Sequence, residues 1–191
     1  MKKFILVVLS LMIVIPLVAC NNNRKMDNDI MLIKESEFSK ETQEVLKIIG
    51  DEIVFFDYTI NETIKSISID IWTYENDGWV NSGKTYGNIE SDNGRIAIRI
   101  NDNFYEIFSI NENGHTKASY KRVVDFSESK AITNSRLSNP TEIKIGKEIP
   151  LWVRLGTDKT SMKAGIIDDF RKADCNAGVA VTITFSDENI D

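Results

Sequence analysis

The sequence predicts a mainly β fold, an antiparallel β-sandwich or rolled sheet of about nine strands, with one N-terminal helix and a short second helix. Two observations support this prediction. Apolar residues, many of them isoleucine, alternate with polar residues along several stretches, which is the two-residue period of a half-buried strand. Asn or Asp followed by Gly, the pattern of a tight hairpin, recurs between these stretches. A closed barrel, or two small α+β subdomains divided near residues 127–140, are alternatives that the same patterns allow.

Residues 36–50 have the spacing of an amphipathic helix. Five positions form one stripe along its face: Phe38, Thr42, Val45, Leu46 and Ile49. Ser36 or Ser39 can cap the first turn, and Gly50 is suited to end the helix. We expect the stripe to pack across an open edge or end of a sheet.

The strand period begins after this helix and recurs over residues 53–60, 66–72 and 95–100. The turn motifs that separate the strands are Asn76-Asp77-Gly78, Asp92-Asn93-Gly94 and Asn113-Gly114. Because Asn, Asp and Gly adopt the positive φ angles of tight hairpins, these motifs predict a meander from residue 53 to about residue 124. Residues 30–33 can add a short strand before the helix.

The second half of the domain begins with residues 126–140, which are rich in Ser, Asn and Thr and predict the longest loop. Residues 142–145 and 149–155 then predict a hairpin around Gly146. Since proline cannot donate a hydrogen bond to a sheet, Pro150 is expected at a sheet edge or near the start of its strand.

Alternation in this second strand predicts which side chains share a face. One face consists of Ile149, Leu151, Val153 and Leu155, and the other of Trp152 and Arg154. Residues 162–174 suggest a short helix, and residues 179–185 predict a closing strand that pairs with an early one.

The first 20 residues have the order of a secretory signal. Lys2 and Lys3 precede an apolar run, which ends at Leu17-Val18-Ala19-Cys20. This ending resembles the lipobox of bacterial lipoproteins, here joined to a small extracytoplasmic β domain. The resemblance implies cleavage between Ala19 and Cys20 and attachment of diacylglycerol and an acyl chain such as palmitate to Cys20. It also implies anchoring at the extracytoplasmic face of the cell membrane.

An uncleaved transmembrane anchor is the alternative for this segment. Its apolar run is shorter than the ~20 residues of a spanning helix, and Pro16 disfavours a regular helix at its end. The predicted organisation is therefore a signal peptide at residues 1–19, a lipidated N-terminus with a flexible tether at residues 20–35, and the β domain at residues 36–191.

The mature chain would be acidic and free of disulfides. Loss of Lys2 and Lys3 leaves 21 basic against 29 acidic residues, a net charge of −8. This charge argues against binding to nucleic acid or to anionic lipid headgroups. With Cys20 lipidated, Cys175 has no partner cysteine in the chain.

No catalytic residue, metal site or cofactor other than the lipid is predicted. His115 is the only histidine, and no nucleophile motif accompanies it. Cys175 follows Asp174, which would raise its thiol pKa, so we interpret it as a packed thiol. Calcium near Asp77, Asp92 or Glu112 is the weaker alternative to their role as turn formers.

Three aromatic residues form the candidate binding surface. Trp72 and Tyr74 have the parity opposite to the strand's isoleucines, and Trp79 joins their face if the chain turns at Asp77-Gly78. An exposed row of this kind could stack on sugar rings or on an apolar patch of a partner. The same parity also fits core packing beneath a second layer, such as the helix at residues 36–50, and Trp152 raises the same question.

These observations predict a membrane-anchored binding module at the cell surface, with cell-wall glycan, a peptide or another protein as its partner. The alternative is a cell-wall-directed enzyme or enzyme inhibitor without a recognisable catalytic motif. An importer's substrate receptor is disfavoured because such receptors usually need two lobes around a cleft.

Overall fold

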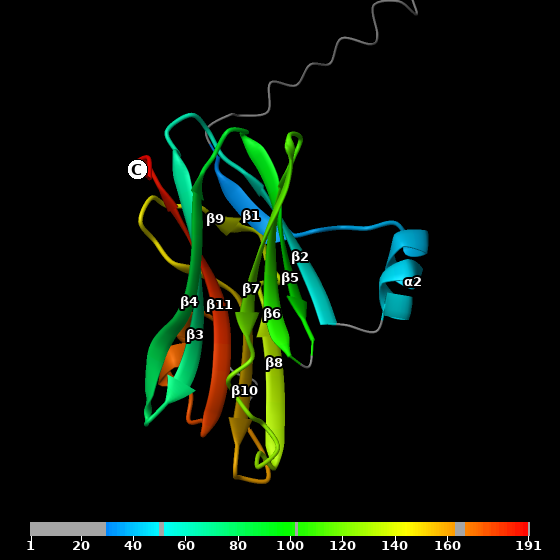
Figure 1. Ribbon diagram of the computed structural model, residues 1–191, viewed down its shortest axis with the longest axis vertical. Helices are drawn as coiled ribbons and strands as arrows, with labels where there is room; N and C mark the ends of the chain where they lie inside the picture. Colours follow the sequence, from blue (N-terminus) through cyan, green and yellow to red (C-terminus); the bar gives the residue numbers. More distant parts are fainter. Residues whose placement is uncertain (1–29, 50–51, 102, 163–166, 191) are drawn as a thin grey trace, which may run out of the picture.

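The computed structural model describes residues 30–49, 52–101, 103–162 and 167–190. Two antiparallel sheets face each other and do not close into a barrel (Figure 1). The predicted mainly β fold of the sandwich type is confirmed, with eleven strands in the described residues where about nine were expected. Strands from both sides of residues 127–140 take part in each sheet.

The six-stranded sheet consists, in spatial order, of β7 (Gly114–Lys121), β6 (Phe104–Asn111), β5 (Asn93–Ile100), β2 (Glu52–Thr59), β1 (Leu32–Glu35) and β9 (Thr141–Glu142). The five-stranded sheet consists of β4 (Gly78–Asn88), β3 (Ser66–Glu75), β11 (Ala177–Ser186), β10 (Ile149–Thr157) and β8 (Ala131–Arg136). The helices are α2 (Lys40–Ile49) and the 3₁₀ helix η2 (Ile167–Lys172).

The main core lies between the sheets and is built from the alternating apolar side chains of both. Its fully buried members include Phe56, Ile69, Ile98, Ile107 and Phe185. The closing strand β11 is the central strand of its sheet, between β3 and β10, so the C-terminal part of the chain is held by two neighbours. The predicted pairing of this strand with an early one is thereby confirmed.

The predicted meander is wrong because the chain changes sheet between β2 and β3 and again between β4 and β5. Asn76 and Asp77 form the turn of the β3–β4 hairpin, with φ angles of 49° and 61°. The turn of the β6–β7 hairpin ends at Gly114, the first residue of β7. Asp92, in contrast, belongs to a connection between sheets, where its carbonyl accepts a hydrogen bond from the Ile60 amide at 2.8 Å.

Two expectations for the second half are also wrong. Residues 126–140 are not one loop, because β8 pairs with β10 as an edge strand. The segment around Gly146 is not a hairpin either, since β9 pairs with β1 in the other sheet. Gly146 has a φ angle of 71°, which favours glycine, and its turn directs the chain from one sheet to the other. Pro150 lies near the start of β10, as predicted.

A bulge at Leu151 changes the faces of β10. The register with β11 shifts between Pro150 and Trp152, so Leu151 and Trp152 are both buried in the main core. Val153 and Leu155 consequently point to the outer face, which corrects the predicted single aliphatic face. The Trp152 indole N–H donates to Glu52 Oε1 of β2, at 2.9 Å across the sandwich.

The predicted helix forms as α2, capped by Ser39, whose Oγ accepts from the Thr42 amide at 3.3 Å. Its expected packing is wrong, because α2 stands away from both sheets (Figure 1) and Val45 remains 59% exposed. The helix lies in the connection between β1 and β2, and Phe38, the first residue of the predicted stripe, lies before α2 and packs edge to face on Phe55 of β2, with ring centroids 5.0 Å apart.

The domain begins earlier than predicted. Leu32–Glu35 form β1 between β2 and β9, so they belong to the sheet and not to the tether. The predicted signal peptide, the cleavage position at Ala19, the lipidated Cys20, and the tether up to residue 29 lie outside the described residues.

Candidate functional site

The three aromatic residues of the predicted surface lie together on the outer face of the five-stranded sheet. Tyr74 and Trp79 face each other across the β3–β4 hairpin, with ring centroids 5.6 Å apart. The Trp79 ring meets Phe170 of η2 edge to face at 4.7 Å, and it lies so close to Gly178 that a Cβ there would collide with it. The three rings are only partly exposed.

These rings belong to a second apolar cluster, which we call the second core. Its buried members are Val153, Leu155, Phe170, Cys175 and Ala180. Helix η2, drawn in orange behind β3 and β4 in Figure 1, covers this cluster. The rings therefore pack beneath a second layer, which η2 supplies in place of α2, and do not form an open stacking platform.

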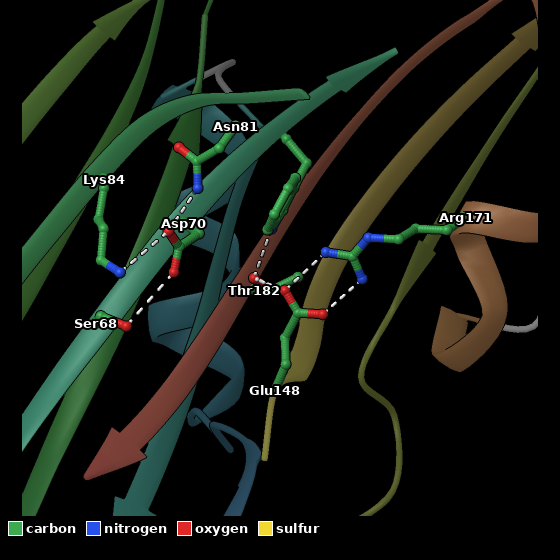
Figure 2. Close-up of polar contacts among 8 residues, drawn as sticks. Ser68, Asp70, Asn81, Lys84, Glu148, Arg171 and Thr182 are labelled. Carbon is green, nitrogen blue, oxygen red and sulfur yellow. Dashed lines mark hydrogen bonds and ion pairs between the residues drawn. The ribbon is translucent and has the colours of Figure 1, made fainter. Parts of the chain in front are cut away.

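A polar network of Arg171, Glu148 and Thr182 links η2 to the sheet (Figure 2). The Arg171 guanidinium donates to both carboxylate oxygens of Glu148, at 2.6 and 2.9 Å, and lies 4.3 Å from the Trp72 ring centroid. Thr182 Oγ1 donates to Glu148 at 2.8 Å and accepts from the Trp72 indole at 3.1 Å. Burial raises the pKa of Glu148, but the hydrogen bonds from Arg171 and Thr182 outweigh burial and lower it.

Asp70 continues this polar row across β3 (Figure 2) and is only 8% exposed. Its carboxylate accepts a hydrogen bond from Asn81 Nδ2 at 2.6 Å and lies 3.7 Å from the Lys84 ammonium. The Ser68 hydroxyl donates to Oδ2 of the same carboxylate at 3.5 Å. Because its partners are internal, Asp70 is interpreted as a structural carboxylate.

Cys175 lies between η2 and β11 in the second core, whereas His115 lies on β7 of the six-stranded sheet, so the two do not form a nucleophile–base pair. Burial, and next the charge of Asp174, raise the pKa of the Cys175 thiol to about 11. His115 is exposed near the start of β7. Across residues 30–49, 52–101, 103–162 and 167–190, no three His, Cys, Asp or Glu side chains are grouped to hold a metal ion.

The structure also contains a cleft that the sequence did not predict. This inter-sheet cleft lies between the C-terminal half of β4 and the β6–β7 hairpin, which reaches the same end of the molecule in Figure 1. Its volume is about 450 Å³, within the range of small-ligand pockets. Its floor consists of Tyr58, Ile67, Ile69 and Ile107.

The cleft exists because small side chains face each other across the sandwich at this corner. On β4, Thr85 and Gly87 point inward, as the cross-strand partners of Ile69 and Ile67. A Cβ built on Gly87 meets nothing within 4 Å. The opposite wall is formed by Ser109, Asn111, Thr116 and Ala118 of β6 and β7. Nearer the start of β4, the Tyr120 ring lies against Gly83 and fills the space between the sheets.

The inner walls of the cleft offer hydroxyl groups without charges. Ser109 and Thr116 are direct cross-strand partners. Within the part of the chain that the structure describes, neither hydroxyl has a hydrogen-bond partner. The charged lining residues Glu90 and Lys117, together with His115, lie at the rim, and Lys117 donates to Glu106 at 3.0 Å. The cleft can therefore hydrogen-bond a neutral ligand, while it lacks the paired carboxylates or the nucleophile of a hydrolase.

A weak signal for this cleft is present in the sequence. Along β4 the inward positions change from valine to glycine and threonine, and along β6 they change from Ile107 to Ser109 and Asn111. Such a change from large to small or polar side chains indicates that the inner face of the strand does not fill the space between the sheets. Only the sheet pairing shows that the two changes meet at one corner.

Comparison with known proteins gives one family match. The model of the YgaN domain matches residues 32–174, three quarters of the chain, and this range contains every residue that lines the cleft. No curated protein and no solved structure gives a significant match. Among the described residues, neither helix has the length and apolar composition to cross a bilayer. The chain belongs to the YgaN domain family.

Proposed function

We propose that this chain is a lipid-anchored binding module at the extracytoplasmic face of the cell membrane, and that it binds its ligand in the inter-sheet cleft. The observation that carries this proposal is the cleft itself, because its walls leave about 450 Å³ open and direct unpaired hydroxyls into it. A structural domain gains stability by filling such a space with side chains.

The address in this proposal rests on the residues that precede the domain. Leu17-Val18-Ala19-Cys20 resembles a lipobox, so a lipid on Cys20 would hold the domain at the membrane. A binding module suits this position better than a wall hydrolase or an enzyme inhibitor, because no specific feature of the described residues supports either of those two functions. In the described residues, the rim of the cleft offers Glu90 and His115 but no second carboxylate.

The address is tested by replacing the lipidation residue. Cys20→Ala should release the protein from bacterial membranes into the medium or the soluble extracellular fraction, while the unchanged protein stays with the membrane pellet. Metabolic labelling with a clickable fatty acid should mark the unchanged protein only. Tight membrane attachment of the Cys20→Ala variant would refute the lipid anchor.

The binding site is tested with the fragment 24–191, which contains every described helix and strand. Its capture on intact cells and purified wall should be abolished by Gly87→Phe, because the ring enters open space in the cleft. The matched control is Gly78→Phe at the other end of β4, where an added Cβ makes only an ordinary contact and the cleft is untouched. Equal capture of both variants would show that the cleft is not the binding site.

A further inference from the structure

We infer that the inter-sheet cleft takes one sugar unit of a neutral oligosaccharide and that the oligosaccharide continues around the edge of β4. This inference rests on the proposed function, because it names the ligand class of the same site.

The distribution of charge around the cleft favours a neutral ligand. Nothing charged lines the inner walls in the described residues, and the rim offers both signs. Lys117 already pairs with Glu106, and the side chain of Asn88 is held by the backbone of Ile190 at 2.8 and 3.1 Å. Inside the cleft, away from the rim, an anionic or cationic group would therefore lose its hydration without gaining a counter-charge.

The polar and apolar groups of the cleft match the two kinds of surface on a sugar ring. Ser109 and Thr116 are cross-strand partners, and their free hydroxyls can both donate and accept, as a ligand hydroxyl or acetamide requires. Below them, Ile67, Ile69 and Ile107 provide an apolar floor for the C–H groups of the ring. A purely apolar ligand would leave the hydroxyls unpaired, at a cost in affinity.

A second recess indicates a chain of sugars and not a single unit. It lies on the outer face of the five-stranded sheet and has a volume of about 300 Å³. Its lining includes the hydroxyl residues Ser68, Thr184 and Ser186, together with one charge of each sign, on Lys84 and Glu188. Tyr86 lines both this recess and the cleft, and it is 62% exposed. Its ring stands at the edge of β4, where a sugar linking the two recesses would stack on it.

Direct binding of soluble oligosaccharides to the full-length protein in detergent tests this inference. The probes are the trimer and tetramer of β-1,4-linked N-acetylglucosamine, with the glucose tetramer as a second neutral probe, measured by calorimetry or by ligand-observed NMR. We expect millimolar or tighter binding of at least one probe, with affinity unchanged between low and high salt because no ion pair forms. Failure of every neutral oligosaccharide to bind would overturn the inference.

Two variant pairs locate the sugar. Tyr86→Ala should weaken binding about tenfold and Tyr86→Phe should not, because stacking needs the ring and not its hydroxyl. Combined Ser109→Ala and Thr116→Val should also weaken binding about tenfold, since two hydrogen bonds are lost. Since Tyr86 is largely exposed, its replacement does not endanger folding. Binding unaffected by both sets of changes would contradict this placement.

The result also separates this inference from the proposed function. If no oligosaccharide binds but capture of the fragment on cells remains sensitive to Gly87→Phe, the ligand class is wrong and the binding module stands. An extended peptide that pairs with the free edge of β4 would be one such ligand. If capture is absent as well, both proposals fail.

Discussion

The second core beneath η2 and the inter-sheet cleft beside β4 differ in the size of the side chains that face each other. In the second core, the Trp79 and Phe170 rings meet edge to face with centroids 4.7 Å apart. Because Gly178 has no side chain, the Trp79 indole can approach the sheet closely. In the cleft, Gly87 on one wall faces Ser109 and Thr116 on the other, and about 450 Å³ stays open. The large rings of the second core are thus covered by η2, whereas the small side chains of the cleft are not covered by another segment of the described chain.

This difference indicates where a ligand has room. Aromatic side chains on a sheet face suggest a stacking site, but the same rings carry enough apolar area to bind a covering segment of their own chain. Small hydroxyl side chains carry too little area to do so. In this domain the missing volume therefore marks the site better than the aromatic surface does.

The largest effect is expected from removing the ring that η2 inserts into the second core. Phe170→Ala should lower the free energy of unfolding by about 3–5 kcal/mol, because Phe170 is fully buried against Trp79. Urea denaturation monitored by tryptophan fluorescence measures this loss. Phe104→Ala is the matched control, since Phe104 is 43% exposed, and it should change stability by about 0.5 kcal/mol or less. Equal losses would mean that η2 does not cover a true core.

A smaller effect is expected from the polar contact that holds η2. Arg171→Gln removes the ion pair with Glu148 and should lower global stability by only about 1 kcal/mol or less, because both side chains are partly exposed. Local opening should nevertheless be visible as several-fold faster alkylation of Cys175, a buried thiol of the second core. Lys172→Gln is the control, since Lys172 pairs with Asp169 at the surface of η2. Unchanged alkylation in Arg171→Gln would show that the pair does not hold η2 closed.

Acid should reproduce this opening in the unchanged protein. Because the folded pKa of Glu148 is lowered, its contribution to stability is present above its ordinary pKa of 4.5 and is lost as the pH falls through the lower folded value. Tryptophan fluorescence should therefore change in that acidic range in the unchanged protein. The change should be much smaller in Arg171→Gln.

Local chemistry made much of the fold predictable from the sequence. Alternation identified β2, β3, β5 and β11, and Asn76-Asp77 forms the hairpin that its residue types require. The choice of sheet was not predictable, because it depends on pairing between distant segments. The turn at Gly146 looks locally like a hairpin, yet its two sides pair with β1 and with β11. The bulge at Leu151 was hidden for the same reason.

The site was predictable only in part. The shared face of Trp72, Tyr74 and Trp79 follows from strand parity, and the structure brings the three rings together. Their cover comes from η2, about a hundred residues later in the chain, and no local pattern assigns it to them. The cleft is lined by five strands from two sheets, β2, β3, β4, β6 and β7, so the residues of its walls could be recognised as inward and small but not as neighbours.

The smallest effect is expected from a larger side chain in the cleft, which would fill space there as the aromatic rings fill the second core. Ser109→Val should raise the free energy of unfolding by about 0.5–1 kcal/mol, because valine favours strands and its methyl groups fill space above Ile107. Ser119→Val on the outer face of β7 has the same change in strand preference but fills no space, and it removes the 3.4 Å hydrogen bond from the serine hydroxyl to Glu106, so urea denaturation should show a smaller gain or a loss. Loss of ligand together with a gain in stability would show that the cleft stays open for binding. A loss of stability in Ser109→Val would instead mean that the serine hydroxyl supports the fold.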